Sequence, residues 1–238
     1  MSPIQFIIII IVGYLLGSLP NAYLVTLAVK RINIFEVGSG NMGGTNVART
    51  LGLGWGIFTA VLDSVKGMLA VVAAQFIVGE SILFAPGFPW INEGMPENLL
   101  IPSMIAALAA VAGHNWSFFA TLLYTYYQKK FGIRGGKGAA TAFGTMLMIL
   151  PVPFNVLLLV VGISIAVITR YASLSVLVCF SITYIAVIAW TVINENVTNL
   201  HILYVVFLAV LIVWRFRENI ERLLTGTERR LGERVTTQ

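Results

Sequence analysis

The stretch IQFIIIIIVGYLLGSLPNAYLVTLA, residues 4–28, indicates the class of this protein because it contains no Lys, Arg, Asp or Glu. About 20 mostly apolar residues suffice for a helix to cross a bilayer. The stretch lacks a basic start and a small-residue cleavage pattern, so we interpret it as a span and not as a signal peptide. The whole chain of 238 residues is 58% hydrophobic and 11% charged, against about 25% charged residues in a soluble domain. We therefore predict an all-α integral membrane protein.

Further apolar segments follow along the chain and set the predicted domain organisation. We predict seven transmembrane helices, at about 4–28, 53–78, 99–122, 138–151, 154–169, 174–192 and 200–215. The fourth segment is short and could be tilted or half re-entrant. Residues 1–215 form one transmembrane domain in this prediction. Residues 216–238 form an interfacial helix and tail, since Ile220, Leu223, Leu224 and Leu231 share one helical face.

The placement of charged residues predicts the orientation. Fourteen of the 15 basic residues fall on one predicted side of the membrane, and the exception is Lys66 inside the second span. The opposite loops, 79–98 and 193–199, contain Glu and no Lys or Arg. By the positive-inside rule the N-terminus lies outside and the C-terminus in the cytoplasm. The net charge of +5 thus reports topology first, and we expect no nucleic-acid partner.

The loop after the first span is rich in glycine and in hydrogen-bonding side chains. Its glycines allow successive backbone N–H groups to converge on one oxyanion, and Arg49 adds a bidentate cation. We predict a phosphate-binding loop that comprises Gly38, Ser39, Gly40, Asn41, Gly43, Thr45, Asn46 and Arg49. The alternative is a tight interfacial turn whose small residues serve helix packing. A dinucleotide site is rejected, because that glycine pattern requires a preceding strand in a soluble βαβ unit.

A second glycine cluster, GIRGGKG at 132–138, lies just before the fourth predicted span. Lys137 and the N-terminus of the following helix would both attract an anion. We predict further substrate contacts from Gly135, Gly136, Lys137 and Gly138. The alternative is an ordinary basic cytoplasmic loop. The cluster does not fit a nucleotide-hydrolysing P-loop, since Gly138 stands where Ser or Thr is required.

Other polar residues leave the chemistry more open. Ser173 follows Arg170 at a cytoplasmic helix junction, and His114 lies near the cytoplasmic end of the third span, where it could be structural or catalytic. Asp63 and Lys66 lie one turn apart in the second span and favour a structural pair. The chain has one cysteine, Cys179, and no paired carboxylates or Cys/His cluster. We predict no metal site and no cofactor.

Six segments together resemble the bacterial acyl-phosphate:glycerol-3-phosphate acyltransferases, the PlsY family. They are GSGNMGGTNVARTLG (38–52), LDSVKG (62–67), GHNW (113–116), GGKGAATAFG (135–144), RYASL (170–174) and RFRENIERLLTGTE (215–228). The resemblance covers about four-fifths of the chain and implies a seven-helix enzyme of the bacterial inner membrane with its active site facing the cytoplasm. The implied reaction moves an acyl group from acyl phosphate to glycerol 3-phosphate and gives lysophosphatidic acid for phospholipid biosynthesis.

The resemblance also implies site residues. Carried over by motif they are Ser39, Arg49, Lys137, Ser173 and Asn219, with Arg217 as a further substrate-binding candidate. Three departures stand out. Phe216 occupies the position of a family His in the tail, residues 118–133 read as an insertion with aromatic and lysine residues, and the loop 79–98 is long.

The expected mechanism is direct acyl transfer. Acyl phosphate is already activated, and Ser39 has no neighbouring base in sequence that would make it a nucleophile. The proton of the attacking hydroxyl passes to the acyl phosphate's own oxygen or, alternatively, to His114. Membrane lipids are the only other partners expected, and no obligate protein partner is implied. The rival interpretation is a transporter or binding protein for a phosphorylated solute.

Overall fold

The computed structural model describes residues 1–80, 95, 97–194 and 199–233, and this part of the chain is helical without a strand. The helices in chain order are α1 (Pro3–Gly17), α2 (Asn21–Lys30), the short 3-10 helix η1 (Ile34–Glu36), α3 (Gly44–Leu51), α4 (Leu53–Ile77), α5 (Glu97–Asn115), α6 (Phe118–Gln128), α7 (Ala139–Ile149), α8 (Val152–Thr169), α9 (Ala172–Ile193) and α10 (Leu200–Leu224). Most of the two predicted acidic loops, 79–98 and 193–199, lies outside the described residues.

Six segments within the described residues are long and apolar enough to cross a bilayer, which confirms an all-helical membrane protein. They are 3–30, 53–77, 98–115, 152–169, 172–193 and 200–224. The remaining predicted span corresponds to α7, which has 11 residues. At 1.5 Å per residue α7 is about 16 Å long, roughly half the hydrocarbon thickness.

The predicted third span, 99–122, is wrong at its C-terminal end, where α5 stops at Asn115 and α6 begins at Phe118. Ser117 separates the two helices. Its hydroxyl accepts from the Ala120 N–H and donates to the Ser18 carbonyl, and its backbone N–H donates to the Arg134 carbonyl. The apolar composition continues across this point, but the cap and these long-range bonds end the helix.

The first span is broken between α1 and α2, and a charged pair from α4 binds at the break. Pro20 supplies no backbone N–H, so the helix cannot continue regularly through it. The Leu19 carbonyl accepts a hydrogen bond from Lys66 Nζ at 3.0 Å, and the same nitrogen lies 2.9 Å from Asp63 Oδ1. The side chain of Asn21, the first residue of α2, donates to that carboxylate at 3.0 Å. Asp63 and Lys66 are therefore a structural ion pair, as the sequence favours.

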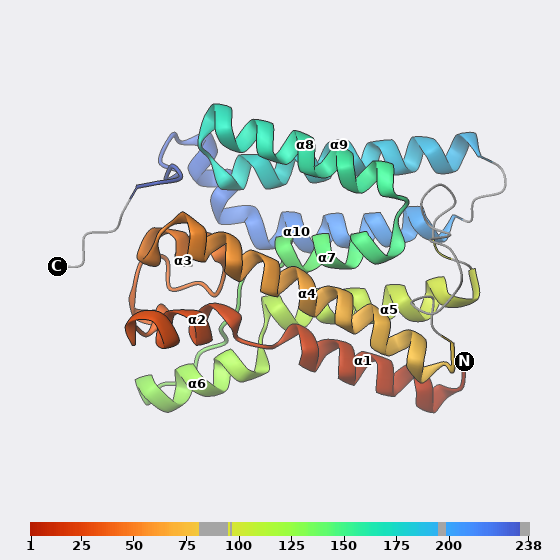
Figure 1. The fold of residues 1–238 in the computed structure, drawn as a ribbon, viewed down its shortest axis with the longest axis horizontal. Helices are drawn as coiled ribbons and strands as arrows, with labels where there is room; N and C mark the ends of the chain where they lie inside the picture. The colour runs from red at the N-terminus through yellow and green to blue at the C-terminus, as the bar shows by residue number, and fades with distance from the viewer. Residues whose placement is uncertain (81–94, 96, 195–198, 234–238) are drawn as a thin grey trace.

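Close backbone contact packs α1 against α5, and the two helices lie side by side with α4 in Figure 1. A Cβ on Gly17 would lie 2.0 Å from the Ala110 carbonyl oxygen, and one on Gly113 would lie 2.1 Å from the Tyr14 carbonyl oxygen. Small residues allow such an approach between membrane helices. On the opposite side of the molecule α8 and α9 form a second group, and α7 and α10 lie between the two groups (Figure 1).

The last helix runs past the predicted domain boundary at residue 215, since α10 continues without interruption to Leu224. The chain then turns at Gly226, which has a φ of +70°. The Leu231 N–H donates to the Arg170 carbonyl at 2.6 Å, and the Arg170 guanidinium donates to the Leu231 carbonyl at 2.8 Å. The segment 227–233 is thereby attached beside the start of α9.

The α1–α5 contact yields a first prediction. Replacing Gly17 by Ala places a methyl group against an immobile backbone carbonyl, and such overpacking costs about 1–3 kcal/mol. We expect Gly17→Ala to lower the thermal unfolding midpoint of the detergent-solubilised protein. Gly54→Ala in α4 is the matched control, because a Cβ there has no heavy atom within 4 Å. Equal midpoints for the two variants would contradict the packing argument.

Candidate functional site

A cavity of about 630 Å³ brings together segments that are far apart in the sequence. Its polar part is lined by Ser39, Asn41, Gly43, Thr45, Asn46, Arg49, Asp63, His114, Gly136, Lys137, Gly138, Ser173, Glu218, Asn219, Arg222, Glu228 and Arg229. Its apolar part is lined by Phe143, Leu158, Leu159, Gly162, Ile163, Ala166, Val176, Cys179, Phe180 and Phe216. All six predicted catalytic residues line this one cavity. A ligand with an anionic head and an apolar chain matches the two parts.

The first glycine loop is shaped by Asn46 and by two left-handed glycines. Gly38 and Gly40 have φ values of +63° and +65°, which favour glycine. Asn46 accepts from the Ser39 N–H at 3.0 Å and donates to the Val37 carbonyl at 3.1 Å. The sequence predicts Asn46 as a substrate contact. In the structure its side-chain amide instead bonds to the backbone of the loop and fixes the shape of the loop. Gly38 and Gly40 do not line the cavity and act on the shape of the loop.

The second glycine loop packs directly on the first. The Met42 N–H donates to the Gly135 carbonyl at 3.2 Å, and the Gly136 N–H donates to the His114 carbonyl at 2.9 Å. A Cβ on Gly135 would lie 2.3 Å from the Asn115 carbonyl oxygen, and one on Gly136 would lie 2.3 Å from the Met42 carbonyl oxygen. Glycine is thus required here for close approach. Gly135 supports the loop and does not line the cavity.

Lys137 projects from this loop toward the last helix. Its Nζ donates to Asn219 Oδ1. Burial, and then the nearby Arg222, lower the pKa of Lys137 to about 8, although Glu228 and Glu218 act in the opposite direction. Lys137 is therefore a cation at neutral pH whose proton is held less tightly than that of an ordinary lysine.

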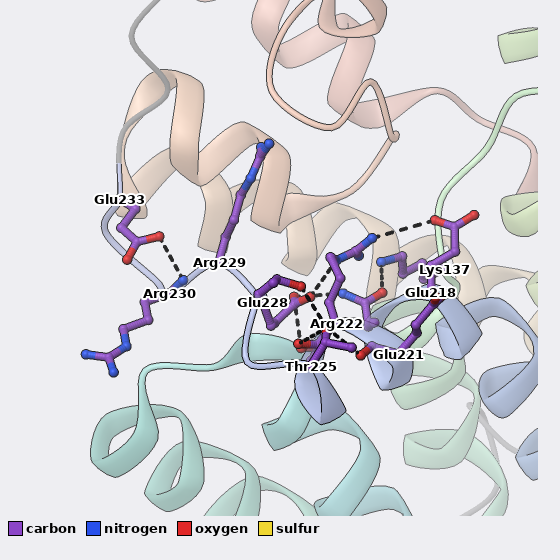
Figure 2. Close-up of polar contacts among 12 residues, drawn as sticks. Lys137, Glu218, Glu221, Arg222, Thr225, Glu228, Arg229, Arg230 and Glu233 are labelled. Atoms are coloured by element: carbon purple, nitrogen blue, oxygen red, sulfur yellow. Dashed lines mark hydrogen bonds and ion pairs between the residues drawn. The ribbon is translucent and has the colours of Figure 1, made fainter.

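Glu228 links the predicted residues of α9 and α10 to the end of the chain. Its Oε1 accepts from Ser173 Oγ at 3.0 Å and from Asn219 Nδ2 at 2.8 Å, and its Oε2 accepts from Arg222 Nε at 2.8 Å. Figure 2 shows Glu228 and Arg222 close together beside α10, with Lys137 facing them. Burial opposes ionisation of Glu228, but the hydrogen bonds from Arg222, Asn219 and Ser173 outweigh it and lower the pKa.

Arg222, Glu228 and Arg229 are site residues that the sequence argument did not select. In the sequence they lie in or directly after the segment 215–228, which resembles the family. From that segment only Asn219 and Arg217 were predicted as site residues. Arg49 donates to the Arg229 carbonyl at 3.4 Å. Burial and the charge of Arg229 lower the pKa of Arg49. The cavity thus gathers an excess of cations at its polar end, which attracts anionic groups.

The positions of His114 and Arg217 do not favour the catalytic and substrate-binding roles predicted for them. His114 is buried, and its Nδ1 lies 3.7 Å from Asp63 Oδ1 without a hydrogen-bond partner in the described part of the chain. Its ring supports Gly136, since a Cβ on that glycine would lie 2.0 Å from Nε2. Arg217 is exposed; its guanidinium donates to the Trp214 carbonyl and lies over the Trp214 ring, outside the cavity lining. Phe216 does line the cavity, with its ring centroid 5.2 Å from Lys137 Nζ.

No group of three or more His, Cys, Asp and Glu side chains that could hold a metal ion occurs in the described part of the chain. The polar side chains that line the cavity are hydroxyls, amides and cations, together with the His114 imidazole and the carboxylates of Asp63, Glu218 and Glu228. The glycine loops add backbone N–H groups. Such groups can bind phosphate and stabilise a developing oxyanion.

Comparisons with known proteins agree with this arrangement. Residues 7–226 match the family model described as glycerol-3-phosphate acyltransferase. A glycerol-3-phosphate acyltransferase 3 of Dehalococcoides mccartyi is 38% identical, with 97% of each chain covered. A glycerol-3-phosphate acyltransferase of Clostridioides difficile is 35% identical, with 98% of this chain and 99% of that protein covered. The crystal structure of PlsY (YgiH), an integral membrane glycerol 3-phosphate acyltransferase in its glycerol 3-phosphate form, gives a TM-score of 0.72 at 28% identity, covering 95% of this chain and 96% of that one.

The Glu228 network yields a second prediction. Glu228→Ala leaves three donors without their acceptor, which costs about 1–3 kcal/mol, so the unfolding midpoint at pH 7 should fall. Because the pKa of Glu228 is lowered in the folded protein, its contribution is present above the ordinary pKa of about 4.3 and is lost as the pH falls through the folded value. The difference between wild type and variant should therefore shrink below about pH 4. Glu221→Ala, at an exposed carboxylate of α10, is the control that should show neither effect.

Proposed function

This chain belongs to the glycerol-3-phosphate acyltransferase family and is an acyltransferase of phospholipid synthesis; from that premise we propose that its donor is acyl phosphate and that the acyl group moves directly to the 1-hydroxyl of glycerol 3-phosphate. The hydroxyl oxygen forms the new ester bond to the acyl carbon, and the bond from that carbon to the phosphate oxygen breaks. Lysophosphatidic acid and inorganic phosphate are the products.

One observation carries this proposal: the cavity has a cationic polar end continuous with an apolar part between α7, α8 and α9. Lys137, Arg49 and Arg222 offset the charge of two phosphate groups, one from each substrate. Backbone N–H groups of the loop 38–46 position one phosphate. The apolar lining holds the acyl chain, so that the reactive carbonyl stops beside the cations.

Direct transfer is supported by the surroundings of Ser39. Among the described residues its hydroxyl has one hydrogen bond, from the Asn41 N–H at 3.4 Å, and no His, Asp or Glu side chain contacts it as a base. His114 is held between Asp63 and the second glycine loop, which favours a positioning role. We therefore assign the proton of the attacking hydroxyl to the departing phosphate oxygen. Ser173 and Asn219 orient the reactants near Lys137.

The proposed topology has seven crossings of the bacterial inner membrane. Six are the long helical segments, and the short helix α7 is added to them as the fourth crossing in chain order. α3, α6 and the C-terminal end of α10 gather at one end of the molecule, opposite the N-terminus (Figure 1). The basic residues other than Lys66 lie at the end of α2, in α3, in the segment 129–137, between α8 and α9, and from Arg215 onward. Their collection on one predicted side supports a cytoplasmic cavity and an external N-terminus. Residues 1–215 would form the membrane domain and 216–238 the cytoplasmic extension. Membrane lipids are the remaining partners.

The test of the proposal uses the purified protein in detergent with acyl phosphate and glycerol 3-phosphate. We expect release of phosphate and formation of lysophosphatidic acid in equal amounts. Lys137→Ala should lower kcat/KM by about 100-fold or more, because a cation that stabilises transition-state charge is lost. Lys30→Ala, at an exposed lysine outside the cavity, should leave the rate near wild type. Phosphate uptake into vesicles without product formation would favour a transporter, and a trapped acyl-Ser39 enzyme would exclude direct transfer.

A pH profile tests the role of Lys137 separately. Only protonated Lys137 is a phosphate-binding cation, and its pKa is about 8. We expect kcat/KM to fall above about pH 8 and to approach a tenfold loss per pH unit. Lys137→Arg keeps its charge to about pH 12 or above, so any residual activity of that variant should lack this alkaline fall. An unchanged alkaline limb in Lys137→Arg would assign the titration to another group.

A further inference from the structure

The insertion that contains α6 presents one uncharged, exposed face. Phe118, Leu122 and Tyr126 follow one another at four-residue spacing along this side of the helix. Phe131 and Ile133 continue the surface beyond the helix end. These five side chains are 51–72% exposed. Two exposed cations, Lys129 and Lys130, lie between the helical and the loop part of the surface, and Lys129 Nζ is 4.8 Å from the centroid of the Tyr126 ring.

The opposite face of α6 is fixed to the rest of the molecule. The Tyr124 ring packs edge-on against Phe35 at 5.7 Å, and the Tyr127 ring lies 6.2 Å from that of Tyr23 in α2. Gln128 donates to Glu36 Oε1 at 2.6 Å. The orientation of α6 is therefore set by its inner contacts. Its apolar outer face points away from the protein as a consequence.

We propose that α6 and residues 129–133 form a binding surface for the anionic phospholipids of the cytoplasmic leaflet. The aromatic and aliphatic side chains enter the boundary between headgroups and acyl chains, and Lys129 and Lys130 pair with lipid phosphate groups. A helix with an apolar face bordered by lysines has the composition of an interfacial anchor. Each basic residue near the surface adds attraction to anionic lipid. The surface is distinct from the substrate cavity, whose lining contains none of these residues.

Charge favours lipid over a second copy of the chain as the occupant. In a two-fold symmetric contact the same patch meets itself. Lys129 and Lys130 of one copy would then approach those of the other. The sequence has no Asp or Glu between residues 98 and 194, and the Glu36 carboxylate bonded to Gln128 offsets only part of this charge. A layer of lipid phosphates supplies the missing negative charge. α6 and α2 also lie side by side at the end of the molecule where the basic segments gather (Figure 1).

The surface is also connected to the second glycine loop. The Arg134 guanidinium lies over the Tyr124 ring at 3.8 Å, and the Arg134 backbone N–H donates to Thr121 Oγ1 at 3.0 Å. Arg134 is three residues before Lys137 in the chain. Lipid bound at α6 would therefore fix the position of the helix that precedes this loop in the chain. The choice of the cytoplasmic leaflet rests on the proposed orientation, whereas lipid binding itself does not depend on acyl transfer.

The first experiment locates the α6 surface in the bilayer. A fluorescent label is placed at Leu122→Cys or at Glu221→Cys, both in a Cys179→Ala background that removes the only native cysteine. The proteins are reconstituted in vesicles whose lipids are brominated on the acyl chains. Quenching at position 122 should exceed that at position 221 by at least about twofold if α6 enters the interface. Equal quenching at the two positions, or disulfide-linked dimers through position 122 of the unlabelled variant, would overturn the proposal.

The second experiment tests the lysines with spin-labelled phosphatidylglycerol and phosphatidylcholine. We expect Lys129→Gln/Lys130→Gln to reduce the preference for the anionic lipid by about fivefold or more. Lys30→Gln/Arg31→Gln removes the same charge from the end of α2 and should reduce the preference less. An equal reduction in both double variants would mean diffuse attraction to the basic face and would overturn the assignment to α6. Neither measurement uses catalysis, so an inactive protein would not affect the outcome.

Discussion

A backbone carbonyl left unpaired in hydrocarbon costs several kcal/mol, and the first span of this protein interrupts its regular helical bonding where it breaks at Pro20. Lys66 reaches across from α4 and donates a hydrogen bond to the Leu19 carbonyl, and Asp63 neutralises the charge of the lysine. A buried lysine without a counter-ion would be far more costly than the broken helix alone. The break, the lysine and the carboxylate therefore depend on one another, and α1, α2 and α4 are held together by this arrangement.

The same cluster reaches the cavity that both glycine loops line. Asp63 and His114 both line it, and His114 supports Gly136 of the second glycine loop. The close approach of α1 and α5 at Gly17 and Gly113 positions His114 in turn. Thus contacts formed within the membrane determine where the glycine loops meet. The loops at the polar end of the cavity therefore rest on packed helices.

The sequence predicted the site residues that lie in local motifs better than the contacts that distant segments form at the site. Ser39, Arg49 and Lys137 lie in segments that combine glycines with hydrogen-bonding or cationic side chains, a combination that a simple turn does not need, and the structure brings them to one cavity. Glu228 escaped notice because it meets Ser173 only after the chain turns back at Gly226. The end of α5 was misplaced because residues 116–122 are apolar enough to continue a span, while the bonds of Ser117 that end it come from distant segments.

The network around Glu228 orients the side chains at the polar end of the cavity, where the proposed function places phosphate. The Asn219 amide donates to Glu228 through Nδ2, which turns Oδ1 toward Lys137. Ser173 and Arg222 are fixed by the same carboxylate. Hydrogen-bonding groups that are already oriented need little rearrangement when charge develops on a substrate. Fixed dipoles stabilise such charge most effectively for this reason. Phe216 brings no donor to the cavity, so in the proposed reaction the orientation of the phosphate groups rests on these residues and on the two glycine loops.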